Sequence, residues 1–396
     1  MVEVVCTFML EKVAPNNGSF TMNNNKTLHT RRTIGLPLIG GMHHIFHLIP
    51  IAVELEGDSA TDVIVYVRSK EEEQFCEDVL AALGATKTRV VLLKSKFFLK
   101  FLSPKSRVLL SNLKIWNQLD AIIVVERTST KLRRFSKRLP PFIHIPHGAG
   151  DRAKGYDTRI QHFDHVLVAG EKDKKRMLDL GIVTEDTCHV TGYIKPYAVK
   201  RIYPETPILF SNSLPVVLYN PHFDLELSSW VEYGANILET FAQNPEMNFI
   251  FAPHIRLFEN HKEAELAEIK AFSKYDNIHV DLGSQSSCDM TYTRGADIYL
   301  GDASSQVYEF LTEPKPCVFL TNSGTDWKDN PDFAHWRYGP VCHSIEDVMS
   351  ALKRASKDHP NYLQAQLAGC LAAKGDPSWN PIHKAAQMVK LILDES

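Results

Sequence analysis

The chain has 396 residues, 44% of them hydrophobic and 23% charged, with a formal net charge of −3. This balance is typical of a globular protein and argues against a disordered or low-complexity chain, and the length favours two domains. Seven scattered cysteines without a C-x-x-C pair argue against a disulfide framework and a zinc site. No apolar run is long enough to span a membrane, and no signal peptide is recognisable, so we expect a cytoplasmic protein.

The first part of the chain alternates between short apolar runs and helical patterns. Residues 1–30 are polar and rich in asparagine, and we predict a poorly ordered extension there. The predicted strands that follow are 33–38, 61–67, 90–93, 121–126, 141–145 and 165–169, with helices at 44–55 and 70–83. Strands separated by helices indicate βαβ units and a parallel sheet.

A second series of the same kind begins near residue 205. Its predicted strands are 216–219, 248–252, 278–281, 298–300 and 317–320, and its predicted helices are 232–242, 263–273 and 304–311. We therefore predict an α/β protein with two Rossmann-like domains, residues 31–196 and 197–378, whose parallel sheets face a cleft. A last amphipathic helix within 379–396 is expected to pack back on the first domain.

Three predicted strands end in a Pro-His pair, which gives His147, His222 and His254. Ligands of open parallel sheets bind beyond the carboxyl ends of the strands, and a histidine fixed between Pro146 and Gly148 suits a general base. Arg256 follows His254 by two residues and can clamp a phosphate. The alternative is a set of loop histidines bonded to nearby carbonyl groups.

A fourth candidate follows the predicted strand 298–300. Asp302, Ser304 and Ser305 precede or open the predicted helix 304–311, whose free N–H groups would bind a donor phosphate. Glu309, further along that helix, is a candidate for the donor's ribose hydroxyls. Asp302 or Ser304 can instead simply cap the helix.

Histidines and basic residues in the first part of the chain give weaker indications of function. His44 and His47 follow a Gly-Gly turn and are expected, with Gly148, to line an acceptor cleft; we expect no metal, because no acidic ligand is near. The stretch from Lys94 to Leu110 mixes cations with large apolar residues, like a membrane-surface segment or a core helix with a basic face.

The charge is divided unevenly along the chain. Residues 1–200 hold 29 Lys and Arg against 21 Asp and Glu, or +8, and the remainder holds 15 against 26, or −11. The basic part favours an anionic partner. Nucleic acid is not expected, because the overall charge is negative and no aromatic-basic motif is present.

At these motifs the sequence resembles the CDP-glycerol glycerophosphotransferase family of teichoic-acid primases and polymerases, which has a GT-B architecture. The resemblance rests on the following motifs: His147-Gly148, Val190-Thr-Gly-Tyr193, His254, and Asp302-Ala-Ser-Ser305 followed by Glu309. It implies transfer of glycerol phosphate, or another polyol phosphate, from a CDP-linked donor to a hydroxyl of a glycan or lipid-linked acceptor, without a cofactor. It also implies that His147 and His254 are catalytic and that the Asp-x-Ser-Ser segment binds donor phosphate.

Two other functions stay open. The helix start at Gly170-Glu-Lys-Asp173 also resembles nucleotide-sugar 2-epimerases, so a GT-B glycosyltransferase or a UDP-sugar 2-epimerase-like enzyme is the alternative. The chain departs from the glycerophosphotransferase pattern at Ala149 and Ala303, which leaves room for another nucleotide-linked donor. A non-catalytic module that keeps the nucleotide pocket is the third possibility.

Overall fold

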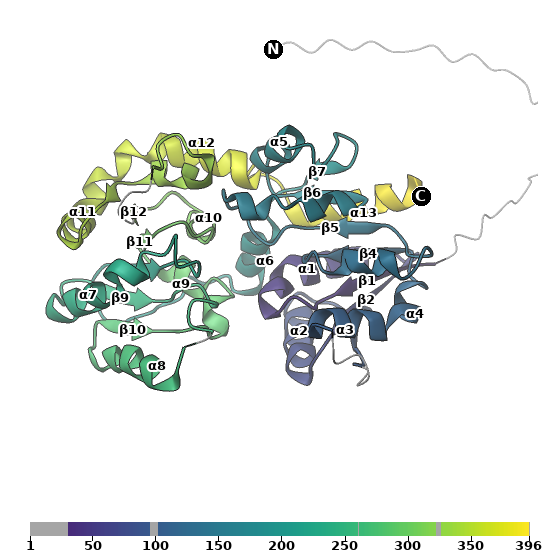
Figure 1. The fold of residues 1–396 in the computed structure, drawn as a ribbon, viewed down its shortest axis with the longest axis horizontal. Helices are drawn as coiled ribbons and strands as arrows, with labels where there is room; N and C mark the ends of the chain where they lie inside the picture. The colour runs from purple at the N-terminus through teal and green to yellow at the C-terminus, as the bar shows by residue number, and fades with distance from the viewer. Residues whose placement is uncertain (1–30, 96–101, 260, 322–325, 396) are drawn as a thin grey trace, which may run out of the picture. The chain divides into compact units, whose positions relative to one another are not determined.

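In a computed structural model, residues 31–95, 102–259, 261–321 and 326–395 are described. The chain from Arg31 onward forms one compact unit, which holds two parallel sheets with helices on both faces (Figure 1). This arrangement confirms the predicted α/β fold class. The predicted extension, residues 1–30, lies outside the described residues.

The first sheet has seven strands in the order β3-β2-β1-β4-β5-β6-β7, and every neighbouring pair is parallel. The strands are β1 (Arg32–Pro37), β2 (Thr61–Val67), β3 (Arg89–Leu92), β4 (Ala121–Val124), β5 (Phe142–His144), β6 (His165–Val168) and β7 (Cys188–Val190). Its helices are α1 (Ile45–Leu55), α2 (Lys70–Ala82), α3 (Pro104–Ser111), α4 (Leu113–Trp116), α5 (Glu171–Asp179) and α6 (Ile194–Ile202). Short 3-10 helices are η1 (Met42–His44), η3 (Ser129–Arg134), η4 (Ala153–Gly155) and η5 (Thr158–His162).

The second sheet repeats the same winding with six parallel strands in the order β10-β9-β8-β11-β12-β13. They are β8 (Val216–Asn220), β9 (Asn248–Phe251), β10 (Ile278–Val280), β11 (Ile298–Gly301), β12 (Cys317–Leu320) and β13 (Val341–Cys342). The helices are α7 (Trp230–Gln243), α8 (Glu263–Lys270), α9 (Thr291–Gly295), α10 (Val307–Phe310), α11 (Ile345–Asp358) and α12 (Leu363–Lys374). The 3-10 helices are η6 (Ala271–Lys274), η7 (Gln285–Ser287), η8 (Pro331–Tyr338) and η9 (His359–Asn361).

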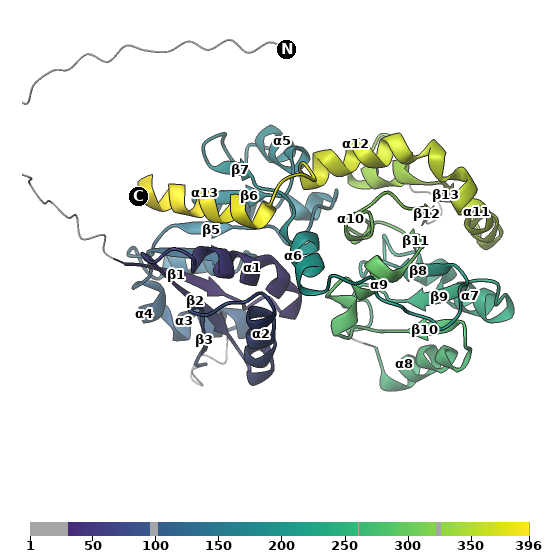
Figure 2. The ribbon, with the colours of Figure 1, turned by 180° about the vertical axis from the view of Figure 1, so that it is seen from behind.

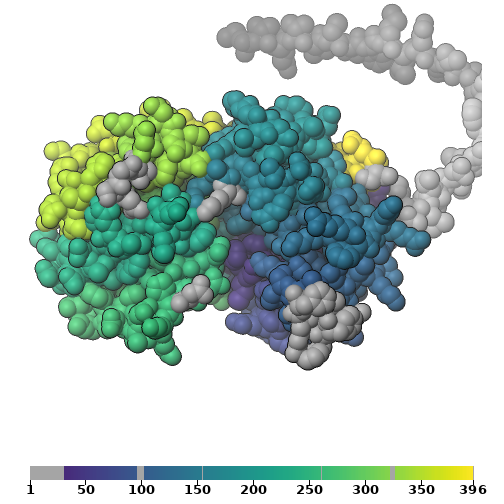
Figure 3. All heavy atoms as spheres, in the orientation of Figure 1, coloured from purple at the N-terminus to yellow at the C-terminus, as the bar shows by residue number. Residues whose placement is uncertain are grey.

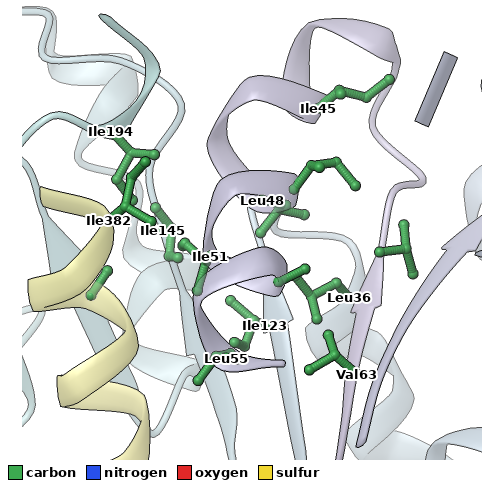
Figure 4. Close-up of a cluster of buried hydrophobic side chains, with 14 of the residues drawn as sticks. Leu36, Ile45, Leu48, Ile51, Leu55, Val63, Ile123, Ile145, Ile194 and Ile382 are labelled. Carbon is green, nitrogen blue, oxygen red and sulfur yellow. The ribbon is translucent and has the colours of Figure 1, made fainter. Parts of the chain in front are cut away.

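The last helix, α13 (Pro381–Glu395), leaves the second half and packs against the first. Figure 2 shows this helix lying over the first sheet beside α1, while α11 and α12 stay with the second sheet. Ile382 shares a buried hydrophobic cluster with Ile51 of α1 and Ile194 of α6 (Figure 4). The apolar face of α13 therefore completes the core of the first half.

The order of each sheet fixes where ligands can bind. In both sheets the winding reverses next to the first strand of the half, between β1 and β4 and between β8 and β11. The loops beyond the carboxyl ends of strands at such a reversal form the usual binding crevice. Within the described ranges, no helix combines the length and apolar character needed to cross a membrane.

Candidate functional site

The first half brings histidines together beyond the carboxyl ends of β1 and β5. The ring centroid of His147, after β5, lies 5.1 Å from that of His44 and 5.9 Å from that of His43, both after β1. Any side chain at Gly40 would collide with the His44 ring, so glycine is needed at this turn. The sequence thus packs three imidazoles at one edge of the sheet.

These histidines differ in their access to solvent. His44 and His47 are 4% and 2% exposed, so they support the wall of the site from behind and do not line it as predicted. His43 is half-buried and His147 is exposed. His43, which precedes His44 in the same turn, therefore takes the position expected for His44.

The second half presents His222 and His254 beyond β8 and β9. Their ring centroids are 5.7 Å apart. The backbone N–H of His254 donates a hydrogen bond of 3.0 Å to the Pro221 carbonyl oxygen. The exposed Arg256 guanidinium lies 4.2 Å from the centroid of the Phe223 ring. Two of the strand-Pro-His junctions are therefore neighbours, with a cation at their edge.

Contacts between the halves bring the two histidine groups to a common site. The Arg152 guanidinium, six residues after Pro146, lies 3.2 Å from His222 Nδ1 and 3.4 Å from Asp224 Oδ2. A Cβ atom at Gly150 would lie 2.6 Å from the Ser305 Cβ, so glycine permits the two halves to touch there. Figure 3 shows a hollow between the blue residues of the first half and the green residues of the second.

The surroundings keep these imidazoles neutral. Burial, followed by repulsion from Arg256 and His147, lowers the pKa of His254 to about 4. Desolvation by the surrounding protein, and then repulsion from Arg127, also lowers the pKa of His147; because solvent reaches this ring, its desolvation is partial. Neutral rings at pH 7 can accept a proton, as a general base must.

Asp302 has a different position from the one predicted for a donor contact. Its carboxylate is fully buried and accepts hydrogen bonds from the N–H of His222 (2.9 Å) and from the N–H (2.8 Å) and hydroxyl (2.9 Å) of Ser229. Burial raises the pKa of this carboxyl to about 6, against the effect of those hydrogen bonds. Asp302 therefore holds the loop after β8 and does not face the hollow.

The segment Ser304–Ser305 also differs from its prediction. α10 begins only at Val307 and has four residues, so the expected helix 304–311 is wrong and the two serines lie in the preceding turn. Ser304 is buried and its hydroxyl donates to Asn220 Oδ1 at 2.7 Å. Ser305 is exposed and is the member of this segment that faces the loop of His147 and Gly148.

Glu309 is buried in an ion pair between the halves. Lys195 Nζ, from α6, lies 2.8 Å and 2.7 Å from the two carboxylate oxygens, and the Tyr193 hydroxyl donates to Oε1 at 3.1 Å. Only 7% of Glu309 is exposed. The Glu309 carboxylate, predicted to contact the donor's ribose, thus binds Lys195 and Tyr193 of the protein itself.

A polar network around Asp151 was missed from the sequence. The buried Asp151 carboxylate accepts hydrogen bonds from Lys172 Nζ (2.6 Å), the Tyr308 hydroxyl (2.9 Å) and His335 Nδ1 (2.8 Å). Burial alone would raise the pKa of Asp151, but these donors hold it well below its usual range. The other ring nitrogen of His335, Nε2, lies 3.0 Å from the Asp302 carbonyl oxygen.

This network joins the two loops of the site. Asp151 ends the stretch that starts at His147, and Asp302 begins the turn that holds Ser305, so His335 connects both. Position in a Gly-rich loop after a strand was the only sequence signal for Asp151. In the part of the chain that the structure describes, no group of three His, Cys, Asp or Glu side chains is arranged to hold a metal ion.

Comparisons with known proteins show the fold. No family model matches the chain, and no curated protein matches it in sequence. Among solved structures, the UDP-GlcNAc 2-epimerase of Neisseria meningitidis bound to UDP-GlcNAc matches with a TM-score of 0.60 and 14% identity, over 92% of this chain and 100% of that one. The S. aureus MnaA structure with UDP gives a TM-score of 0.60 and 14% identity, over 92% and 97%.

A third structure belongs to the group suggested by the sequence resemblance. The wall teichoic acid polymerase TagF, soaked with CDPG, matches with a TM-score of 0.58 and 11% identity, over 92% of this chain and 88% of that one. These likenesses confirm the GT-B type of two-sheet fold. At identities this low they leave the choice of reaction to the site.

Proposed function

We propose that this protein transfers a polyol-phosphate group, glycerol phosphate in the first instance, from a CDP-linked donor to a hydroxyl of a glycan or lipid-linked acceptor. The proposal rests on two imidazoles from opposite halves, His147 and His254, which are near enough for His147 to lower the pKa of His254. Arg152 and Arg256 add positive charge beside His254. Neutral bases next to fixed cations suit an uncharged nucleophile and an anionic donor.

The proposed reaction is an in-line displacement at phosphorus. The acceptor hydroxyl oxygen attacks the phosphorus that bears the glycerol, a new P–O bond forms, and the P–O bond to CMP breaks. His147 takes the hydroxyl proton, while His254, Arg256 and Ser305 stabilise the charge that develops on the phosphate oxygens and on CMP. Arg152 holds His222 at the border of the halves and adds positive charge to the donor side.

A nucleotide-sugar reaction is the second candidate, and the solved structures favour it. Two of the matching proteins hold UDP or UDP-GlcNAc, and the same histidines could serve a glycosyltransferase or a UDP-sugar 2-epimerase-like enzyme. An epimerase needs no acceptor. A glycosyltransferase releases the nucleoside diphosphate, whereas polyol-phosphate transfer releases the monophosphate.

Chromatography of nucleotides distinguishes the candidates. The protein is incubated separately with CDP-glycerol and UDP-GlcNAc, with and without a bacterial lipid extract as the source of acceptor. We expect CMP from CDP-glycerol that depends on the extract and on His147. Release of UDP, or conversion of intact UDP-GlcNAc to its 2-epimer, without any reaction of CDP-glycerol would replace the proposal by the second candidate.

A further inference from the structure

The segment that follows β4 carries an unusual concentration of positive charge. Residues 127–138 contain six cations and no Asp or Glu; these cations, with Phe135, are called the basic segment here: Arg127, Lys131, Arg133, Arg134, Lys137 and Arg138. Residues 101–150 as a whole hold nine Lys and Arg against two Asp and Glu, or +7, and Glu126, one of the two acids, is buried. The chain as a whole is negative, so this charge is local.

The fold turns the basic segment outward. Leu132 of η3 is 1% exposed and belongs to the same buried cluster as Val108 and Leu109 of α3. With this anchor pointing inward, Lys131 and Arg134 on either side are exposed. The Phe135 ring, next in the chain, is 58% exposed.

Most of these charges have no acidic partner among the residues that the structure describes. Arg127 lies 3.8 Å from Asp157, and Arg133 pairs with Asp164. For the other four cations of the basic segment, no ion pair occurs within the residues that the structure describes. Cations that only stabilise the fold are usually paired with acidic side chains, whereas these four face the solvent. They are therefore accessible to an anionic partner.

We propose that the basic segment is a docking surface for an anionic phospholipid bilayer. Cations at the headgroup level are attracted by the negative surface potential, and an exposed aromatic ring among them can enter the interface. A single-stranded nucleic acid would require several stacking aromatic rings along a groove, and Phe135 is the one aromatic residue of the basic segment. The chemistry therefore fits a lipid surface better.

The location of the surface agrees with a lipid-linked acceptor. Arg127, its first cation, follows β4, and His147 follows β5, which is paired in parallel with β4 through Val124 and His144. The basic segment thus begins at the edge of the candidate site. The sequence predicted a membrane contact between Lys94 and Leu110, and we now propose the basic segment in its place. In the earlier stretch Val108 and Leu109 are buried, and residues 96–101 lie outside the described ranges.

Vesicle sedimentation tests this proposal without a nucleotide donor, so its outcome does not depend on the proposed reaction. The full chain is mixed with vesicles of phosphatidylcholine alone or with one-third phosphatidylglycerol. We expect sedimentation only with the anionic vesicles and a loss of binding at high salt. The triple variant K131Q/R134Q/R138Q should bind roughly 100-fold more weakly, at about fivefold for each cation removed, and Phe135→Ser should weaken binding several-fold.

Matched variants carry the same changes at other exposed positions. The triple variant K175Q/K353Q/R354Q removes three exposed cations from α5 and α11, and Leu367→Ser removes a leucine that is 48% exposed. Both should bind vesicles as the unchanged protein does, and melting temperatures should confirm that all variants fold. Equal binding to uncharged vesicles, full binding by K131Q/R134Q/R138Q, or displacement from vesicles by a single-stranded oligonucleotide at equal phosphate concentration would overturn the proposal.

Discussion

His147 combines three local properties that a general base needs. It follows a buried strand, so its backbone is fixed; its ring is exposed, so a substrate can reach it; and its neighbours favour the neutral imidazole. The first property could be predicted from the Pro-His-Gly sequence. The other two depend on Arg127 and on residues of both halves, which the sequence does not place.

Replacing His147 tests this role directly. We expect His147→Gln to lower kcat by about 10²- to 10⁴-fold, the usual contribution of a general base, while donor binding is kept. The release of CMP is measured at saturating donor. His162→Gln, at an exposed histidine of η5, is the control and should keep full activity. A His147→Gln enzyme with most of its activity would remove this residue from the mechanism.

The pH dependence follows from the direction of the pKa shift. A base acts when it is neutral, and the pKa of His147 lies below the ordinary value of 6.5. The neutral form therefore persists as pH falls through 6.5, and kcat/KM should stay level there and decline only at more acidic pH. The profile is measured from pH 4 to 8 with the protein's stability checked at each point. An acidic limb centred at or above 6.5 would show that the active base is another group.

Asp151, Lys195 and His335 could not have been found from the sequence. Asp151 and His335 are separated by 184 positions, and Lys195 and Glu309 by 114. The role of these side chains depends on contacts between the halves, which a sequence pattern does not reveal. Such a contact, with Lys195, occupies the Glu309 carboxylate. The Asp302 carboxylate is held instead by His222 and Ser229 of its own half.

Among the elements, most strands were predictable from the sequence, whereas several helices, including α11 and α12, were not. The strands of both sheets that carry four or more buried apolar residues were located within two residues of their bounds. β7 and β13, with three and two residues at the edges of the sheets, were missed. Shortness alone is not the reason, because β10 has three residues at an edge and was predicted. α10 is shorter than predicted because Ser304 bonds to Asn220 and so holds the chain in a turn.

The contribution of α13 can be measured on one helix with an internal control. Ile382 is 1% exposed in the core of the first half, whereas Leu391 is 54% exposed. Ile382→Ala should lower the free energy of unfolding by about 2–5 kcal/mol, because it leaves a cavity, and Leu391→Ala should change it by less than about 0.5 kcal/mol. Denaturant unfolding measures both. Equal effects would mean that α13 does not pack on the first half in solution.

At the scale of the whole molecule, polar contacts join the halves. Lys195 pairs with Glu309, Asp151 with His335, and Arg176 with Asp332 at 2.6 Å. Each pair takes one residue from each side of the candidate site. The halves of this chain are therefore held in register by specific charges as well as by α13.

A double-mutant cycle measures the strength of one such pair. Lys195→Met alone should destabilise the protein by about 3–5 kcal/mol, because it leaves the buried Glu309 carboxylate without its cation. The double variant with Glu309→Leu should be more stable than Lys195→Met, since an apolar pair can replace a buried ion pair. Additive losses in denaturant unfolding would indicate that the two side chains do not interact.

The central claim, that a CDP-linked donor binds between the two halves, is tested most directly by thermal stabilisation. Melting temperatures are measured with CDP-glycerol, CDP-ribitol, CMP, UDP-GlcNAc and UMP, because a ligand that binds the native state raises the melting temperature with its occupancy. We expect the cytidine compounds to stabilise the protein, CDP-glycerol the most, and Arg256→Gln to weaken the effect. Stabilisation by the uridine compounds alone would contradict the proposed CDP-linked donor. It would indicate that this protein is a nucleotide-sugar enzyme.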